Sequence, residues 1–154
     1  MRDKFLALYE RAAASELSAW ATSPSSLLAL IIVLDQFPRN MFRGEPRAFA
    51  TDAQALAAAQ GMVDAGWDRG LAPLERMFVY LPFEHAEDAP MQARALELFE
   101  GLADLPAVGD VVEWARRHQA VIARFGRFPH RNAILGRAST PEEIEYLAQP
   151  GSSF

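Results

Sequence analysis

The sequence contains no cysteine, few lysines and no apolar run long enough to cross a bilayer. The absence of cysteine excludes disulfide bonds, thiolate zinc sites and cysteine nucleophiles, and it fits a reducing compartment. The longest apolar run, from Leu27 to Leu34, is far shorter than the ~20 residues that a bilayer-spanning helix needs. Residues 1–20 carry acidic side chains among their apolar positions, so they fit an amphipathic helix and not a signal peptide. The sequence therefore predicts a cytoplasmic protein with no membrane partner.

The sequence also has fewer basic than acidic residues. Lys and Arg number 15 against 20 Asp and Glu, so the formal net charge is -5 at pH 7. This balance disfavours nucleic acid as a partner. The arginines gather in two stretches, at residues 39–47 and 116–137, so local positive pockets remain possible. With 154 residues, 51% of them hydrophobic, the chain fits one globular domain over residues 1–154.

Apolar residues recur at three- and four-residue spacings along most of the chain, which is typical of amphipathic helices. Pro38 and Pro82 are expected to end two of these helices, because proline lacks the backbone N–H. Gly126 stands where a left-handed C-terminal cap of the helix at 111–125 is expected. Thr140 and Glu143 form a T-x-x-E capping box before the last helix. The pattern predicts an all-α fold of about seven helices, at residues 5–20, 23–37, 51–63, 71–81, 90–105, 111–125 and 140–148. A simple helical bundle is the alternative to a stacked array.

Two similar segments, LDQFPRN at 34–40 and RFPHRN at 127–132, each follow an apolar helix. In one interpretation each Phe-Pro pair only stops a helix, with Arg and Asn capping exposed carbonyls. In the other, the two turns face one cleft, with arginines as fork-shaped donors for a carboxylate or phosphate and Asp35 orienting them. Pro38 is expected to push Phe37 out of the helical region, so that Arg39 and Asn40 fold back over the helix end.

His85 lies between two prolines and is flanked by acidic residues, which suits acid–base work or a metal. No second histidine stands at a metal-binding spacing, so the sequence predicts no metal and names no cofactor. His118 falls on the apolar stripe of its helix, as expected of a hydrogen-bonded histidine in the core or at the edge of a cleft. None of the common nucleophile, phosphate-loop, zinc or dinucleotide motifs occurs.

Several segments resemble a bacterial family of uncharacterised proteins: LDQFPRNMFRG (34–44), AFATD (48–52), ERMFVYLPFEHAED (75–88), FGRFPHRN (125–132) and LGRASTPEEIEYLAQPGSSF (135–154). The resemblance implies a tetratricopeptide-like fold of stacked antiparallel helix pairs, and it brings no established activity. This sequence departs from the family pattern in two respects. Relatives usually begin with an additional aromatic-rich segment, and serine is more common at the position of Ala86.

Three functional hypotheses follow from these patterns. The first is a binding module whose cleft takes a small anionic molecule or a peptide carboxylate. The second is a hydrolase or lyase of a small metabolite, with His85 or His130 as the acid–base group. The third is a protein-interaction scaffold with an exposed apolar patch. The sequence leaves the oligomeric state open. The predicted ligand-binding residues are Asp35, Gln36, Arg39, Asn40, His85, Glu87, Arg127, His130, Arg131 and Asn132.

Overall fold

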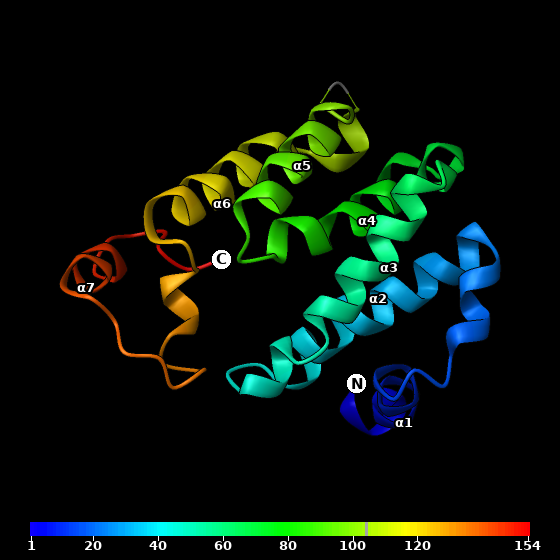
Figure 1. The fold of residues 1–154 in the computed structure, drawn as a ribbon, viewed down its shortest axis with the longest axis horizontal. Helices are drawn as coiled ribbons and strands as arrows, with labels where there is room; N and C mark the ends of the chain where they lie inside the picture. Colours follow the sequence, from blue (N-terminus) through cyan, green and yellow to red (C-terminus); the bar gives the residue numbers. More distant parts are fainter. Residues whose placement is uncertain (104) are drawn as a thin grey trace.

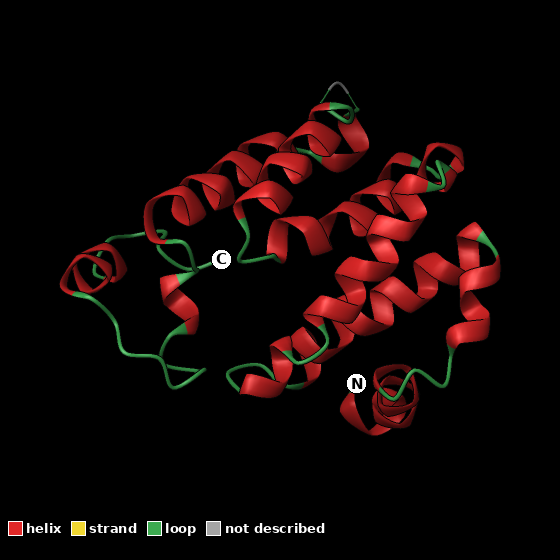
Figure 2. Cartoon of the chain, in the orientation of Figure 1, coloured by secondary structure: helices red, strands yellow, loops and turns green. Residues whose placement is uncertain are grey.

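The computed structural model describes residues 1–103 and 105–154, and within them it contains helices and no strands (Figure 2). The all-α prediction is therefore confirmed. Consecutive helices pack against each other from α1 through α6, and α2 also packs against α4. This arrangement is compatible with stacked helix pairs (Figure 1). The α-helices are α1 (Arg2–Ala13), α2 (Pro24–Met41), α3 (Asp52–Asp64), α4 (Pro73–His85), α5 (Ala89–Glu100), α6 (Val111–Phe125) and α7 (Pro141–Leu147).

The core is built around α2, whose side chains from Leu27 to Leu34 are mostly buried. Small residues on α3 face this helix layer, since Ala55 and Ala59 are both fully buried. Their small size allows α3 to pack closely against α2. None of the helices in the described ranges is long and apolar enough to cross a membrane.

The expectation that Pro38 ends the second helix was wrong, because α2 continues to Met41 with the proline inside it. Proline removes one backbone N–H, which leaves the carbonyl four residues earlier, that of Leu34, without its usual donor. The Thr51 hydroxyl donates to this carbonyl instead, at 2.6 Å and in a buried setting. A side chain from the following helix junction thus replaces the missing bond, and the helix continues.

The expectation for Pro82 was wrong in the same way, since α4 runs through it to His85. Both continuations matter for the candidate site. Arg39 stays on α2, one turn beyond Asp35, and does not fold back over a helix end. His85 becomes the last residue of α4 and so has a position defined by a regular helix.

The first helix is shorter than its apolar pattern predicted. It ends at Ala13, and Ser15 adopts a positive φ of 62° before a 3-10 helix at Ser18–Thr22. At the other end of the chain, the predictions are confirmed. Gly126 closes α6 in the left-handed conformation, and the capping box of Thr140 and Glu143 begins α7.

Candidate functional site

The candidate site is a cleft with a volume of about 710 Å³ where the end of α2, the end of α4, α6 and the turn after α6 meet. Five of the predicted residues line it directly, namely Gln36, Arg39, His85, His130 and Arg131. Asp35 lies beneath this wall, with only 1% of its surface exposed. Side chains from both Phe-Pro segments, Gln36 and Arg39 from the first and His130 and Arg131 from the second, thus lie on one cleft.

The centre of the wall is a histidine held by a buried carboxylate. His85 Nδ1 lies 2.7 Å from Asp35 Oδ1. Burial acts to raise the pKa of Asp35, but the charge and hydrogen bond of His85, the charge of Arg39 and a hydrogen bond from Gln36 outweigh it, and the pKa falls to about 2. Asp35 is therefore ionised at neutral pH and accepts a hydrogen bond from Nδ1–H of His85.

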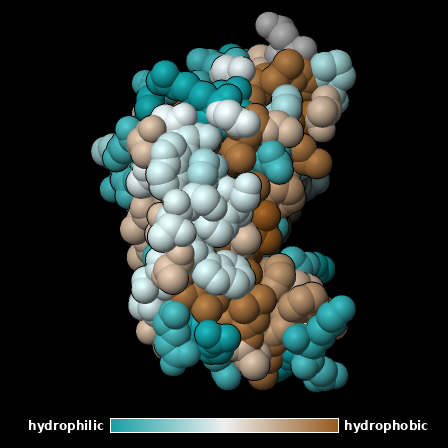
Figure 3. Space-filling view, turned by 90° about the vertical axis from the view of Figure 1, so that its right-hand side faces the viewer, coloured by the Kyte–Doolittle hydropathy of each residue, from teal (hydrophilic) through white to brown (hydrophobic). Residues whose placement is uncertain are grey.

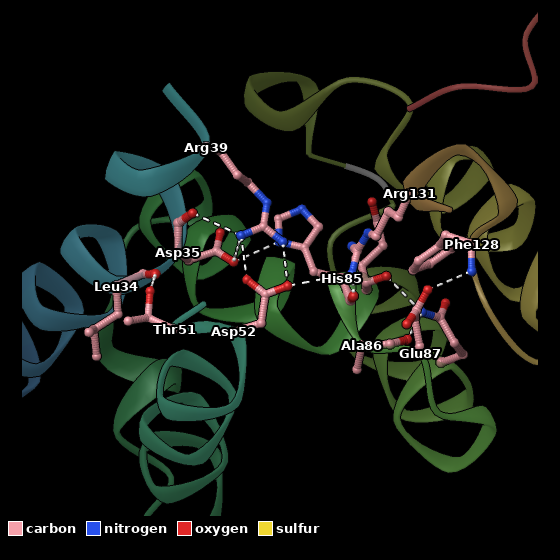
Figure 4. A network of polar contacts seen from close by, with 12 residues as sticks. Leu34, Asp35, Arg39, Thr51, Asp52, His85, Ala86, Glu87, Phe128 and Arg131 are labelled. Carbon is pink, nitrogen blue, oxygen red and sulfur yellow. Dashed lines mark hydrogen bonds and ion pairs between the residues drawn. The ribbon is translucent and has the colours of Figure 1, made fainter. Parts of the chain in front are cut away.

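This assignment leaves the other ring nitrogen of His85, Nε2, as the basic one. Nε2 makes no hydrogen bond to any residue in the described ranges. Figure 4 shows this nitrogen directed away from Asp35 and Asp52. A buried carboxylate that fixes the tautomer and the ring orientation of a histidine is the arrangement by which enzymes prepare an imidazole to take a proton.

Two arginines of the cleft wall share one carboxylate, Asp52, at the N-terminus of α3 (Figure 4). Arg39 binds it with both terminal nitrogens, at 2.7 and 2.9 Å, and its Nη1 also lies 3.3 Å from Asp35 Oδ1. Arg131 Nη1 lies 3.5 Å from Asp52 Oδ2. The charges of two carboxylates, Asp35 and Asp52, thus balance those of the two guanidinium groups on this wall.

Arg131 is held between two aromatic rings. Its guanidinium carbon lies 4.6 Å from the ring centre of Phe49 and 4.7 Å from that of Phe128. Its Nη2 donates to the backbone carbonyl of His85 at 3.0 Å. Burial is the main reason that the pKa of Arg131 falls to about 10, so it is still charged at neutral pH. The stacking and the bond to His85 link α4 to the turn after α6.

A second carboxyl group of the cleft, Glu84, is nearly buried. Burial, and then the negative charge of Asp35, raise its pKa to about 7. Its Oε1 lies 3.3 Å from His118 Nδ1, and that nitrogen also lies 2.8 Å from the carbonyl oxygen of Trp114. Burial lowers the pKa of His118 to about 4, so the ring is neutral and Nδ1–H donates to Trp114. Glu84 is thus a carboxyl group that still holds its proton near neutral pH.

His130 is neutral as well. Burial, followed by the positive charge of Arg131, lowers its pKa to about 4. Its Nδ1 is buried and has no hydrogen-bond partner within the described part of the chain. Of the two histidines proposed as the acid–base group, His85 has a carboxylate partner and His130 has none.

The other predicted residues lie outside the cleft. Asn40 donates back to the carbonyl of Gln36 on the surface of α2. Arg127 makes a two-point ion pair with Glu143, at 2.8 and 2.9 Å, and Asn132 donates to the same carboxylate. These contacts connect the turn after α6 to α7, which is a structural role.

Glu87 is also engaged elsewhere, although it lines a smaller neighbouring cavity of about 450 Å³. It forms a two-point ion pair with Arg137, at 2.8 and 2.9 Å, and accepts a hydrogen bond from the backbone N–H of Phe128. Burial tends to raise its pKa, but these bonds outweigh burial and lower it. Within the described ranges, no group of three or more acidic or histidine side chains could hold a metal ion.

The predicted set of site residues omitted three that line or support the cleft, Asp52, Glu84 and His118. Asp52 stands at the start of a predicted helix, and nothing in its local pattern indicates two distant arginines. His118 was interpreted as a core or cleft-edge residue, and it is both hydrogen-bonded and on the cleft wall. The acidic stretch around His85 was a signal for Glu84, but only packing identifies which of its carboxylates is buried.

Comparison with known proteins identifies a family for this chain. A model described as a bacterial protein of unknown function (DUF924) matches residues 1–151. The chain belongs to this family. A solved structure, titled as a protein of unknown function from Agrobacterium tumefaciens, is 44% identical. The match covers 96% of this chain and 81% of that one, with a TM-score of 0.88. A comparison with curated proteins finds no significant match.

Proposed function

We propose that this DUF924 protein is an enzyme that acts on a small organic molecule by acid–base catalysis, with His85 as the base. The observation that carries the proposal is the 2.7 Å contact between His85 Nδ1 and the buried, ionised Asp35. A surface histidine needs no such partner, and a purely structural one has no reason to leave Nε2 without a partner on a cleft wall.

Glu84 supplies the complementary group. A carboxyl group with a pKa of about 7 can give a proton at neutral pH. His85 and Glu84 line the same cleft, so one can take a proton from water or from a carbon next to a carbonyl while the other protonates the leaving group. Hydrolysis and elimination of a small metabolite both fit this pair. Activity is expected to fall as the pH rises above about 7, because Glu84 then loses its proton.

The test is to incubate the purified protein with a small-molecule extract of bacterial cells and to follow the composition by mass spectrometry. His85→Asn is the informative variant, because the asparagine amide can still donate to Asp35 while Nε2 is lost. Arg94→Ala is the matched control, since Arg94 is exposed on α5 and pairs with Glu97 outside the cleft. Circular dichroism checks that all three proteins are folded.

The expected result is that the wild type and Arg94→Ala consume the same compounds and His85→Asn leaves them intact. An extract left unchanged by the wild type, or turnover by His85→Asn equal to that of the wild type, would contradict the proposal.

A second candidate is binding of a carboxylate or phosphate without reaction. It is favoured by one observation, that Arg39 and Arg131 both contact Asp52 and so lie on the same wall. An anion would have to compete with Asp52 for these donors, which is why we rank this function below catalysis. Calorimetric binding of inorganic phosphate or acetate that is lost in Arg131→Lys, together with an unchanged extract, would favour the binding function.

A scaffold has less support. The exposed large apolar side chains in the described ranges are spread over different elements and include Leu74 on α4 and Ile144 on α7. On the face drawn in Figure 3, apolar residues in brown lie among hydrophilic and intermediate ones and do not cover the face.

A further inference from the structure

Three aromatic rings enclose one part of the cleft. They belong to His118 on α6 and to Phe128 and His130 in the turn that follows. The ring centres of His118 and Phe128 lie 5.6 Å apart at an angle of 83°, and those of Phe128 and His130 lie 5.7 Å apart. These three rings leave a slot between them. The side chain of Phe154 fills it.

The Phe154 ring contacts all three rings in geometries that aromatic pairs prefer. It stacks on His118 with ring centres 4.0 Å apart and an angle of 27° between the planes. It meets His130 edge to face at 5.6 Å and Phe128 at 6.1 Å. A planar six-membered ring therefore fits this slot by shape, with one face and two edges covered.

The walls of the slot are firmly built. Phe128 is fully buried, and its backbone N–H donates to Glu87 Oε1 at 2.8 Å. His118 is 7% exposed and its Nδ1 is held by the carbonyl of Trp114. Both histidine rings are neutral at pH 7 because burial lowers their pKa values to about 4, so the slot presents aromatic surface and not charge.

The occupant is more exposed than the walls. Phe154 is 37% exposed. The segment that leads to it is attached by a hydrogen bond from Arg117 to the carbonyl of Gly151 at 3.2 Å and by one from the Ser152 hydroxyl to the carbonyl of Leu147. Neither bond involves Phe154 itself. The side chain can leave the slot without breaking either of them.

We infer that this slot is a binding subsite for the aromatic ring of the substrate, and that Phe154 occupies it when no substrate is bound. The inference rests on the proposed function, because the slot and His85 belong to one cleft and a ring bound there leaves the rest of the molecule in the same cleft as the base. The buried Nδ1 of His130, which has no partner in the described ranges, suits a ring that carries a hydrogen-bonding group such as a hydroxyl.

Phenol and cyclohexanol are suitable probes, because they share size and hydroxyl group and differ in aromaticity. Binding is measured by NMR titration of the backbone amides in the wild type, Phe154→Ala and Ile144→Ala. The last variant is the control, since Ile144 is an equally apolar, exposed side chain on α7 that does not line the cleft.

We expect phenol to shift the amide signals of His118 and Phe128 and to bind Phe154→Ala between about two-fold and about ten-fold more tightly than the wild type, the range that one aromatic pair accounts for. Cyclohexanol is expected to show a smaller gain, and Ile144→Ala is expected to match the wild type. Equal gains for phenol and cyclohexanol, signals that shift elsewhere, or no gain in Phe154→Ala would overturn the inference.

These outcomes are separable from those of the proposed function. His85→Asn is expected to bind phenol as the wild type does, because His85 is not part of the slot. If phenol binds in the slot as expected while the cell extract is left unchanged, the aromatic subsite is retained and the catalytic role of His85 is rejected. If the extract is turned over and phenol shows no preference for Phe154→Ala, the catalytic role is retained and the subsite is rejected.

Discussion

Glu84 provides the sharpest thermodynamic test of the site. Its pKa is raised from 4.5 to about 7, chiefly by burial. Between these two pH values the folded protein holds a proton that the unfolded chain has released, so stability falls as the pH rises through this window. A difference of this size corresponds to about 3 kcal/mol at ~1.4 kcal/mol per pH unit, and the whole cost is present above pH 7.

Glu84→Gln removes this cost, because glutamine has nearly the same shape and stays neutral at every pH. We expect the variant to be about 3 kcal/mol more stable relative to the wild type at pH 8 than it is at pH 4.5. The measurement is urea denaturation of both proteins at several pH values in this range. Titrating groups far from Glu84 contribute equally to both proteins and cancel in the difference.

Glu87→Gln is the matched control with the opposite sign. Its ion pair with Arg137 lowers its pKa in spite of burial, so the substitution is expected to destabilise the protein at neutral pH. If the difference in stability between Glu84→Gln and the wild type stays constant from pH 4.5 to pH 8, Glu84 is not held in its protonated form, and its role as the acid of the site fails with it.

Three further substitutions test other parts of the structure. Thr51→Val leaves the buried carbonyl of Leu34 without a donor and is expected to cost about 1–3 kcal/mol in urea denaturation, whereas Thr51→Ser keeps most of the stability. Asp35→Asn removes a carboxylate whose pKa is about 2 against an ordinary 3.8, so its free energy of unfolding is expected to fall by about 2 kcal/mol at neutral pH. The wild type loses this stabilisation as the pH falls from about 4 to about 2, so the variant is expected to be less sensitive to acid. Arg127→Ala breaks the ion pair with Glu143 and is expected to speed hydrogen exchange in α7 while α2 is unaffected; equal rates in α7 would contradict the structural role of this pair.

Local chemistry was sufficient to predict several elements of the fold. The left-handed Gly126 and the capping box before α7 were identified correctly, because the conformation of a glycine and the hydrogen bonds of a cap depend on neighbouring residues. The apolar stripe of α6 was equally clear, since one face of this helix packs on the core along its whole length. These are features that a short segment carries within itself.

The two internal prolines show where that reasoning ends. Pro38 and Pro82 are helix breakers by their own chemistry, yet both lie inside helices. For Pro38 the reason is the Thr51 hydroxyl, which comes from a different element and supplies the bond that proline removes. A donor 13 residues away from the proline is invisible to a local pattern, so the positions of Arg39 and Asn40 were predicted wrongly even though Arg39 belongs to the site.

The sequence by itself determined the all-helical class, the helix ends governed by local caps, and the residue types from which a site could be built. Only the tertiary structure decided which of them meet. It brought His85 to Asp35, gave both arginines the same partner in Asp52, and placed Arg127 and Asn132 in a structural cluster. It also decided the protonation states, because the pKa of Glu84 depends on burial and on a charge from another helix. These properties arise from packing between distant segments, which no single segment encodes.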